Sequence, residues 1–250
     1  MLKSFLLVFL FFCGGMMTTN AAFAQTSADS LNQNRPVYAD VENSFYSAIG
    51  SNSRLYNGKL YEFYDHSIQS NAYFMDINDW RPGSVVYDGY LYDKVDMLYD
   101  LFKDELVIHL YNSYLKISLI SEKVKSFNVL DHHFIYLKQD AANPTSLKSG
   151  FYDVLYDGKI KVLAKRKKTI QASGNLSVTI YSYFTPTTVD YYLYKNGNYY
   201  TVNSQGEFLN VLKDRKKQVQ DFIKSNKIKY RKGREEAMTM IAGYYDHLTD

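Results

Sequence analysis

The side chains that could bind a metal ion are few and poorly spaced for that purpose. The chain has one cysteine and five histidines. His132 and His133 are adjacent, and neighbouring residues of a strand point to opposite faces of a sheet, so they would not naturally bind one ion together. The stretch Asp76–Asp79 suggests a calcium loop, but position five of an EF-hand pattern would be Trp80, which offers no oxygen ligand. We therefore expect no metal site and no cofactor.

The sequence shows no motif for hydrolysis. It contains no serine elbow, no serine with a histidine at a motif spacing, and no cysteine in a nucleophile motif. Its 26 acidic residues contain many possible carboxylate pairs for glycoside cleavage, so that signal has no specificity. We predict no catalytic residue and favour a non-enzymatic protein. A hydrolase that acts on glycans or peptides through an unmarked carboxylate site is the alternative.

Aromatic side chains are the first candidates for binding. Trp80 is the only tryptophan and lies in the turn sequence Trp80-Arg81-Pro82-Gly83. An exposed Trp80 would be a platform for a sugar ring or a partner's side chain, whereas a buried one would fill the core. Tyr90 and Tyr92 fall on the outward side of an alternating segment, and we include them in the predicted binding surface.

Charge is unevenly distributed along the chain. The segment Asp76–Glu105 has eight acidic and three basic residues, whereas Lys213–Arg234 has ten basic and two acidic residues. The basic segment could meet anionic lipid heads, an acidic polysaccharide or an acidic partner, or could simply be a solvated helix face. Its first lysines, Lys213, Lys216 and Lys217, complete the candidate binding residues. A nucleic-acid partner is not expected, because no recognition motif is present.

The N-terminal residues are typical of a signal peptide. Lys3 precedes an apolar run, Phe5–Phe12, that is too short to span a bilayer. Ala22-Phe23-Ala24 has the small-x-small pattern that a signal peptidase cleaves, so we place the cut before Gln25. We expect a periplasmic or secreted protein without a transmembrane span.

Lipid attachment at Cys13 is the rival interpretation of this N-terminus. Phe12 argues against it, because it stands where a lipobox requires a small side chain. Cleavage after Ala24 also removes Cys13, so the mature chain would have no thiol and could form no disulfide.

Period-two alternation and glycine turns predict a β structure. All 25 tyrosines follow the signal peptide, and tyrosine suits a half-buried pleated surface. One segment has Leu91, Val95, Met97, Tyr99 and Leu101 on a face that we expect to point inward. Asn-Gly and Asp-Gly pairs favour type I′ hairpin turns. These pairs lie at residues 57–58, 88–89, 157–158 and 196–197.

These patterns define the expected organisation. We predict an antiparallel meander that forms a curled sheet, a sandwich or a partly open barrel, followed by two or three helices. Ser204 and Glu207 have the spacing of a capping box, and a last helix should begin near Arg234. The expected parts are a signal peptide (1–24), a flexible lead-in (25–40), the β domain (41–203) and a helical region packed on it (204–250).

Several segments resemble uncharacterised exported proteins of Bacteroidota. The likeness is carried by Gly83–Tyr92, Met97–Asp100, Asp104–Val107 and the basic tail that ends in Tyr244-Tyr245. The resemblance implies export and no particular activity. The many tyrosines, the lack of a catalytic motif and the signal peptide favour a cell-envelope or secreted accessory protein that binds another envelope protein or a glycan. A carrier of a lipid or other apolar ligand inside a curled sheet is a further alternative.

Overall fold

The computed structural model describes residues 50, 53–139, 147–175 and 178–249, which belong to one compact unit, Asp40–Asp250. The predicted signal peptide, the lead-in and Cys13 lie outside the described residues. Within the described part, no helix combines the length and apolar character needed to cross a membrane.

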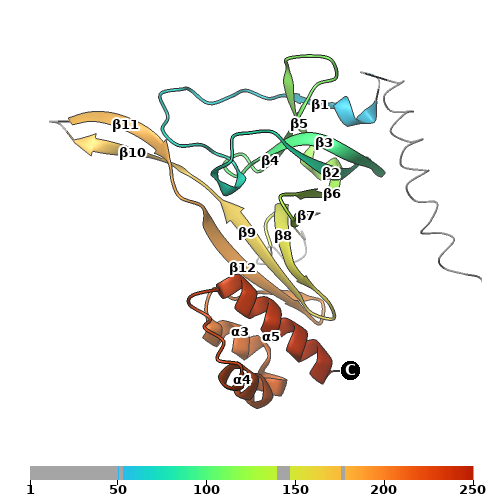
Figure 1. Ribbon diagram of the computed structural model, residues 1–250, viewed down its shortest axis with the longest axis vertical. Coiled ribbons are helices and arrows are strands. Elements are labelled where there is room, and N and C mark those ends of the chain that lie inside the picture. The colour runs from blue at the N-terminus through green and yellow to red at the C-terminus, as the bar shows by residue number, and fades with distance from the viewer. Residues whose placement is uncertain (1–49, 51–52, 140–146, 176–177, 250) are drawn as a thin grey trace, which may run out of the picture. The chain divides into compact units, whose positions relative to one another are not determined.

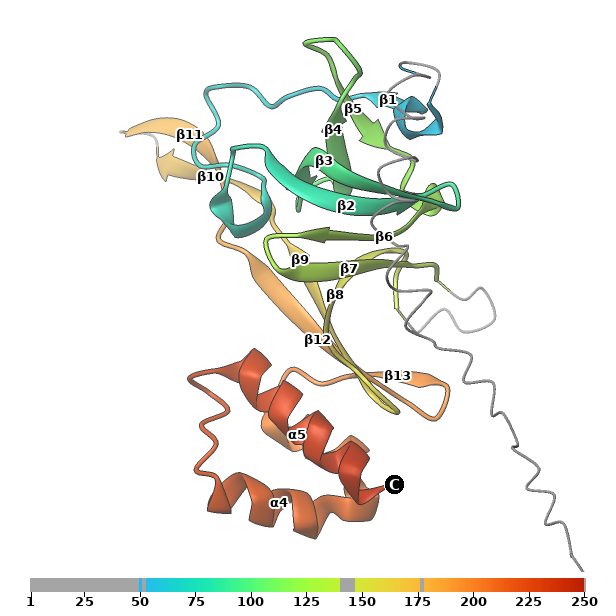
Figure 2. The same cartoon turned by 45° about the vertical axis from the view of Figure 1, so that its right-hand side comes forward.

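Eleven strands form one antiparallel sheet that does not close into a barrel (Figures 1 and 2). The spatial order is β1-β5-β4-β3-β2-β6-β7-β8-β9-β12-β13, so β1 and β13 are the edges. The predicted mainly β, antiparallel class with C-terminal helices is confirmed. The strands are β1 (Gly58–Leu60), β2 (Arg81–Tyr87), β3 (Tyr90–Asp100), β4 (Glu105–His109), β5 (Lys116–Leu119), β6 (Val124–Val129), β7 (His132–Leu137), β8 (Gly150–Asp157), β9 (Lys161–Lys167), β12 (Thr188–Lys195) and β13 (Asn198–Thr201).

A separate two-stranded ribbon, β10 (Ile170–Asn175) with β11 (Val178–Phe184), extends beyond β9 and β12 (Figure 1). Its base is held by the loop that follows β1. The Gln69 amide donates to the Ser182 carbonyl at 2.9 Å, and the Phe184 amide donates to the Gln69 carbonyl at 3.0 Å. This loop therefore joins the base of the ribbon to the β sheet.

Two of the four glycine pairs form the predicted type I′ turns. Asp88-Gly89 and Asn196-Gly197 have positive φ at both positions and join β2 to β3 and β12 to β13. The pair at 157–158 also lies in a hairpin, between β8 and β9, but without positive φ. The prediction for Asn57-Gly58 is wrong, since no hairpin turn occurs there. A Cβ at Gly58 would lie 2.4 Å from the Ser118 carbonyl oxygen, so close approach of β5 explains this glycine.

The predicted inward face of β3 is wrong in its first half. Leu91 is 41% exposed, whereas Tyr92 is buried. Lys94 has a φ of 56°, and the pairing of β2 with β3 shifts register between Gly83 and Val85. An extra residue at such a bulge lets positions an odd number apart face the same side. Tyr92 and Met97 therefore both enter the core.

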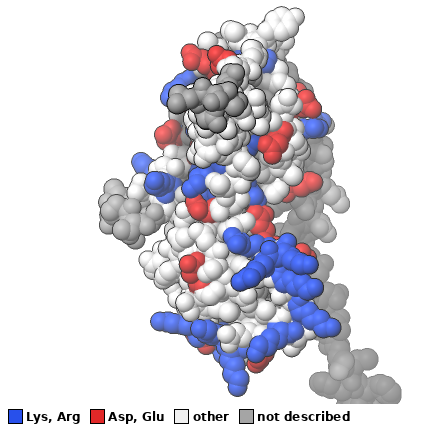
Figure 3. All heavy atoms as spheres, turned by 90° about the vertical axis from the view of Figure 1, so that its left-hand side faces the viewer, with Lys and Arg blue, Asp and Glu red and all other residues white. Residues whose placement is uncertain are grey.

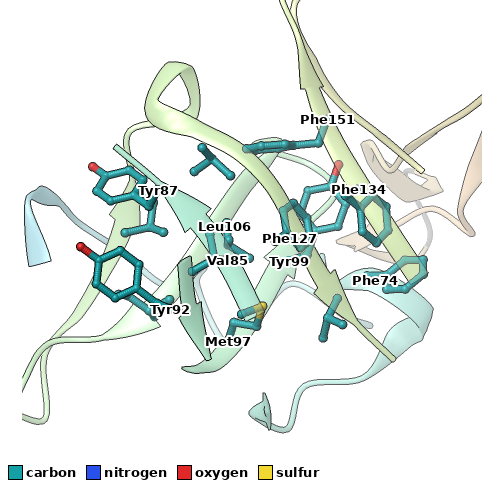
Figure 4. Close-up of a cluster of buried hydrophobic side chains, with 14 of the residues drawn as sticks. Phe74, Val85, Tyr87, Tyr92, Met97, Tyr99, Leu106, Phe127, Phe134 and Phe151 are labelled. Carbon is teal, nitrogen blue, oxygen red and sulfur yellow. The ribbon is translucent and has the colours of Figure 1, made fainter. Parts of the chain in front are cut away.

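Aromatic rings fill the core of the N-terminal part of the sheet (Figure 4). Phe127 and Phe134 stack with centroids 4.7 Å apart, and Tyr99 meets them edge-on at 5.3 and 5.0 Å. Phe151 packs edge-on against Phe127 at 5.2 Å. Edge-to-face and offset contacts of this kind stabilise aromatic cores beyond simple burial.

Three helices lie at the other end of the sheet, where the first and the last contact β8, β9 and β12 and the middle one packs on both of them (Figures 1 and 2). The predicted capping box is confirmed: Ser204 Oγ accepts from the Glu207 amide, and the Glu207 side chain accepts from the Ser204 amide. A second core forms where Val162 and Leu193 of the sheet meet Phe208 and other helical residues. The helices are α3 (Gln205–Val211), α4 (Lys216–Ser225) and α5 (Arg234–Leu248), and the 3₁₀ turns are η2 (Arg54–Tyr56), η3 (Phe74–Asp76), η4 (Ser121–Lys123) and η5 (Lys213–Arg215).

Candidate functional site

A groove of about 400 Å³ lies between the loop after β1, the residues before β2 and the base of β11. We call it the aromatic groove. Its volume falls within the usual range of ligand sites, about 300–1,000 Å³. Apolar rings and polar side chains both line it, which suits a ligand that has apolar faces and hydrogen-bonding groups. Its lining includes Phe63, Asp65, His66, Asn78, Trp80 and Phe184.

The two aromatic walls of this groove differ in how firmly they are held. Trp80 is partly buried, with its ring centroid 3.9 Å from that of His109 and 5.5 Å from Lys116 Nζ. Phe63 is 54% exposed, and its ring meets that of Tyr61 edge-on with centroids 5.1 Å apart. The groove therefore combines a fixed ring with an accessible one.

A buried carboxylate anchors the loop that carries Phe63. Asp100 is fully buried and accepts hydrogen bonds from the Tyr61 and Tyr64 hydroxyls at 2.8 and 2.5 Å. It also accepts from the backbone amides of Phe102 and Lys103, at 2.8 and 3.0 Å. Burial and, next, this carboxylate raise the pKa of both phenols far above the ordinary range, so they act as neutral donors. Asp100 therefore holds the loop in place, although it does not itself line the groove.

A second groove, of about 820 Å³, lies where the β8–β9 and β12–β13 turns meet the helices. We call it the basic groove, because its lining has three lysines and one carboxylate. Tyr200, which is 41% exposed, is its accessible aromatic residue. The lining includes Lys159, Lys195, Asn196, Tyr200, Lys213 and Asp214.

Hydrogen bonds fix one wall of the basic groove. Lys195 Nζ lies 2.5 Å from Asp214 Oδ1 and 4.8 Å from the Tyr245 ring centroid. The Tyr245 hydroxyl donates to Asp214 Oδ2 at 2.7 Å. Partial burial would raise the pKa of Asp214, but hydrogen bonds from Lys195 and Tyr245 outweigh it and lower the pKa. The carboxylate is therefore engaged in holding the strand end against the helices.

A buried ion network connects the sheet to α5. Asp153 accepts from Arg166 Nη2 at 2.6 Å and lies 2.8 Å from His132 Nδ1. The same Arg166 nitrogen donates to Glu235 at 2.9 Å, and Glu235 accepts from the Tyr191 hydroxyl at 3.0 Å. Arg166 thus pairs with both carboxylates, and neither carboxylate belongs to the lining of the two grooves. This arrangement is typical of a structural network.

Neither groove carries the carboxylate pair that glycoside cleavage requires. Among the described residues, Asp65 is the sole carboxylate lining the aromatic groove and Asp214 the sole one lining the basic groove. In the described part of the chain, no group of three or more His, Cys, Asp or Glu is placed to hold a metal ion. Both grooves offer aromatic rings and hydrogen-bonding side chains to a ligand.

The structure separates the predicted aromatic residues. Trp80 lines the aromatic groove. Tyr90 lies at the other end of the β2–β3 hairpin, is 43% exposed and sits beneath Arg54, whose guanidinium carbon is 5.1 Å from the ring centroid. Tyr92 is 3% exposed and belongs to the core, so it lines neither groove.

The predicted lysines lie at the start of the helical end. Lys213 lines the basic groove, whereas Lys216 and Lys217 are exposed on the first turn of α4. Lys216 Nζ donates to the Asn210 side chain at 3.3 Å, and Asn210 also lines the groove. The three lysines are therefore neighbours, although Trp80 and Tyr90 lie elsewhere.

Several groove residues had no signal of their own in the sequence. Phe63 and Asp65 stand in a segment without clear periodicity, and Lys195 and Tyr200 read as ordinary strand positions. The one useful indication is the Asn196-Gly197 turn, which brings Lys195 and Tyr200 to the same end of a hairpin.

Comparisons with other proteins do not add to this description. No protein-family model matches the chain, and neither do any of the curated proteins or solved structures with which it was compared. The resemblance to exported proteins of Bacteroidota stays an expectation.

Proposed function

We propose that this protein is an exported, non-enzymatic accessory protein of the cell envelope that binds a glycan in the aromatic groove. The observation that carries the proposal is the pairing of a fixed Trp80 with an exposed Phe63 in one groove. Sugar rings have apolar faces that pack on aromatic rings, as other apolar ligand surfaces do. Another envelope protein is the second partner class.

The polar rim of the groove supports a sugar more than a purely apolar ligand. Asp65, His66 and Asn78 supply donors and acceptors for hydroxyl groups beside the rings. A lipid would instead need a continuous apolar cavity. The cavity that borders the core beside Phe74 holds about 10 Å³, which is no more than the space for one water molecule.

Export is part of the proposal and rests on the sequence. The apolar run before Ala22-Phe23-Ala24 supports cleavage before Gln25. Fractionation of the producing cells, with mass spectrometry of the mature N-terminus, tests it. Full-length protein in the cytoplasm would contradict export.

Binding of the mature chain to a panel of neutral oligosaccharides tests the groove. Phe63→Ala should weaken the best ligand about tenfold, since removing an aromatic anchor typically costs more than 1 kcal/mol. Tyr114→Ala is the matched control, because Tyr114 is 99% exposed and lies outside the groove. A panel without any binder, or equal affinities of the two variants, would contradict the proposal. Release of reducing ends from a bound glycan would instead indicate the hydrolase.

A further inference from the structure

We infer that the basic groove is a second, independent binding site, for a saccharide that carries carboxylate or phosphate groups. Its volume of about 820 Å³ lies in the range of ligand sites, and it is separate from the aromatic groove in all of its lining residues. The inference does not depend on what the aromatic groove binds.

The groove is preorganised by contacts between elements far apart in the sequence. Lys195 at the end of β12 donates to Asp214 in η5 and to the Val211 carbonyl at 3.2 Å. Tyr245 of α5 completes the clamp by donating to Asp214. A site held in this way loses little conformational freedom when a ligand binds, which favours affinity.

The charge of the groove selects an anion. Three lysines and a single carboxylate line the groove. Lys195 is bound to that carboxylate, and Lys159 Nζ donates to the Thr249 carbonyl at 2.8 Å. Among the described residues, no ion pair or hydrogen bond engages the Lys213 side chain, which is exposed. Lysine ammonium groups bind carboxylate and phosphate as point charges. Figure 3 shows Lys and Arg side chains gathered at the level of the helices on one face of the protein, where they add to the positive potential of this end.

Neutral groups in the same groove suit a sugar. Tyr200 is 41% exposed, so its ring can pack against the apolar face of a pyranose. Asn196 and Asn210 line the groove beside it and offer amide donors and acceptors to hydroxyl groups. An inorganic anion would use the lysines but not these side chains.

Two other anionic partners fit less well. A membrane surface would need an exposed apolar helix face, but Val219 and Ile223 of α4 are buried and Phe222 stacks on Tyr244 with centroids 4.1 Å apart. An acidic protein would need a contact surface of roughly 800 Å² on each partner rather than a groove of ligand size.

Calorimetric titration of the mature chain at low salt tests the inference, with oligogalacturonate and phosphomannan fragments as acidic probes. At least one should bind, and a neutral oligosaccharide of equal length should not compete. Lys213→Glu should weaken binding at least tenfold. Lys229→Glu, which makes the same charge change at an exposed lysine outside the groove, should weaken it less than twofold. Phe63→Ala should leave it unchanged.

Several results would overturn the inference. If neither acidic probe binds, the groove is not a site for an acidic saccharide. If the two lysine variants lose affinity equally, the binding reflects general attraction by a basic surface. Unchanged affinity in Tyr200→Ala would show that no sugar ring packs there. Binding to phosphatidylglycerol vesicles, but to neither acidic probe, would identify a membrane surface instead. Circular dichroism of each variant confirms that the fold is retained.

Discussion

The carboxylate of Asp153 lies 2.6 Å from Nη2 of Arg166, with side chains 1% and 10% exposed, in the strands that lead to the helical end of the protein. The contact links β8 to β9, and through Glu235 it reaches α5. Two carboxylates and one guanidinium thus join the β8–β9 hairpin to α5, a helix that no local sequence pattern connects to it. Because the pair is buried, water cannot take the place of the guanidinium if Arg166 is removed.

Arg166→Met should destabilise the protein by about 3–5 kcal/mol, since it leaves the Asp153 carboxylate buried without its guanidinium. Urea unfolding followed by circular dichroism measures the change. Lys161→Met is the matched control, because Lys161 pairs with Asp157 on the surface, with side chains 37% and 62% exposed. That variant should lose no more than about 1 kcal/mol. Equal losses of unfolding free energy in the two variants would show that burial does not determine how much these ion pairs contribute to stability.

Asp246 should be essential for docking α5 on the β8–β9 turn. Its carboxylate accepts from the Lys159 and Ile160 amides at 2.7 and 3.3 Å and from the Tyr156 hydroxyl at 3.0 Å. Asp246→Ala removes the acceptor of these donors, and each unsatisfied buried donor costs about 1–3 kcal/mol. Thermal unfolding should show a clear drop, together with faster hydrogen exchange of the Lys159 amide. Asp246→Asn keeps one acceptor oxygen and should recover part of the loss; no recovery would contradict this role.

Loss of the capping box at the start of α3 should lower the stability of the protein by a smaller amount. Ser204→Ala should cost about 1 kcal/mol, because the Glu207 amide loses its side-chain acceptor. Ser204→Asp keeps an acceptor and should remain close to the wild type in urea unfolding. Ser204 lines neither groove, so glycan affinity at the aromatic groove should not change in either variant. A loss of that affinity would mean that the helices influence the groove.

The contact between His109 and Trp80 predicts a pH dependence. Burial and, next, the positive charge of Lys116 lower the pKa of His109 below its ordinary value of 6.5, although Asp96 opposes this. The folded state therefore favours the neutral ring. The resulting stability is present above pH 6.5 and is lost as the pH falls through the lower, folded-state pKa. Acidification should thus weaken the wall of the aromatic groove.

Trp80 fluorescence can follow this titration directly, because the chain has no other tryptophan. The signal should change in one step with a midpoint below pH 6.5, and His109→Gln should abolish the step. A midpoint above 6.5, or a step that persists in the variant, would contradict the assignment. Glycan affinity measured over the same pH range should fall with the same midpoint if Trp80 forms the binding wall.

Local sequence patterns predicted individual turns, strands and helices better than they predicted how these elements are arranged in space. Asp88-Gly89 and the capping box at Ser204 act within a few residues, so their effects are visible in the sequence. The bulge at Lys94 could not be predicted, because lysine is not a residue that favours positive φ. As a result, Tyr92 was assigned to the outward face although it is buried. The Leu130-Asp131 turn between β6 and β7 was hidden for the same reason.

The candidate sites depended on contacts that span much of the chain. The aromatic groove unites the loop after β1 with Phe184, and the basic groove unites Lys159 with Thr249. Such pairings follow from strand order, which alternation alone does not specify. Trp80 was found because it is the only tryptophan, and Lys213 because it begins the basic segment, whereas Phe63 and Tyr200 do not differ from other aromatic residues of the chain.

The core between the sheet and the helices also sets an order of events during synthesis. Its strand half, around Val162 and Leu193, is made long before Met238 and Ile241, which close it from α5. Until those last residues emerge, the part of this apolar surface that α5 covers stays exposed. Only a chain that includes α5 can therefore shield this surface fully, and a product ending before residue 238 should be prone to aggregation and proteolysis.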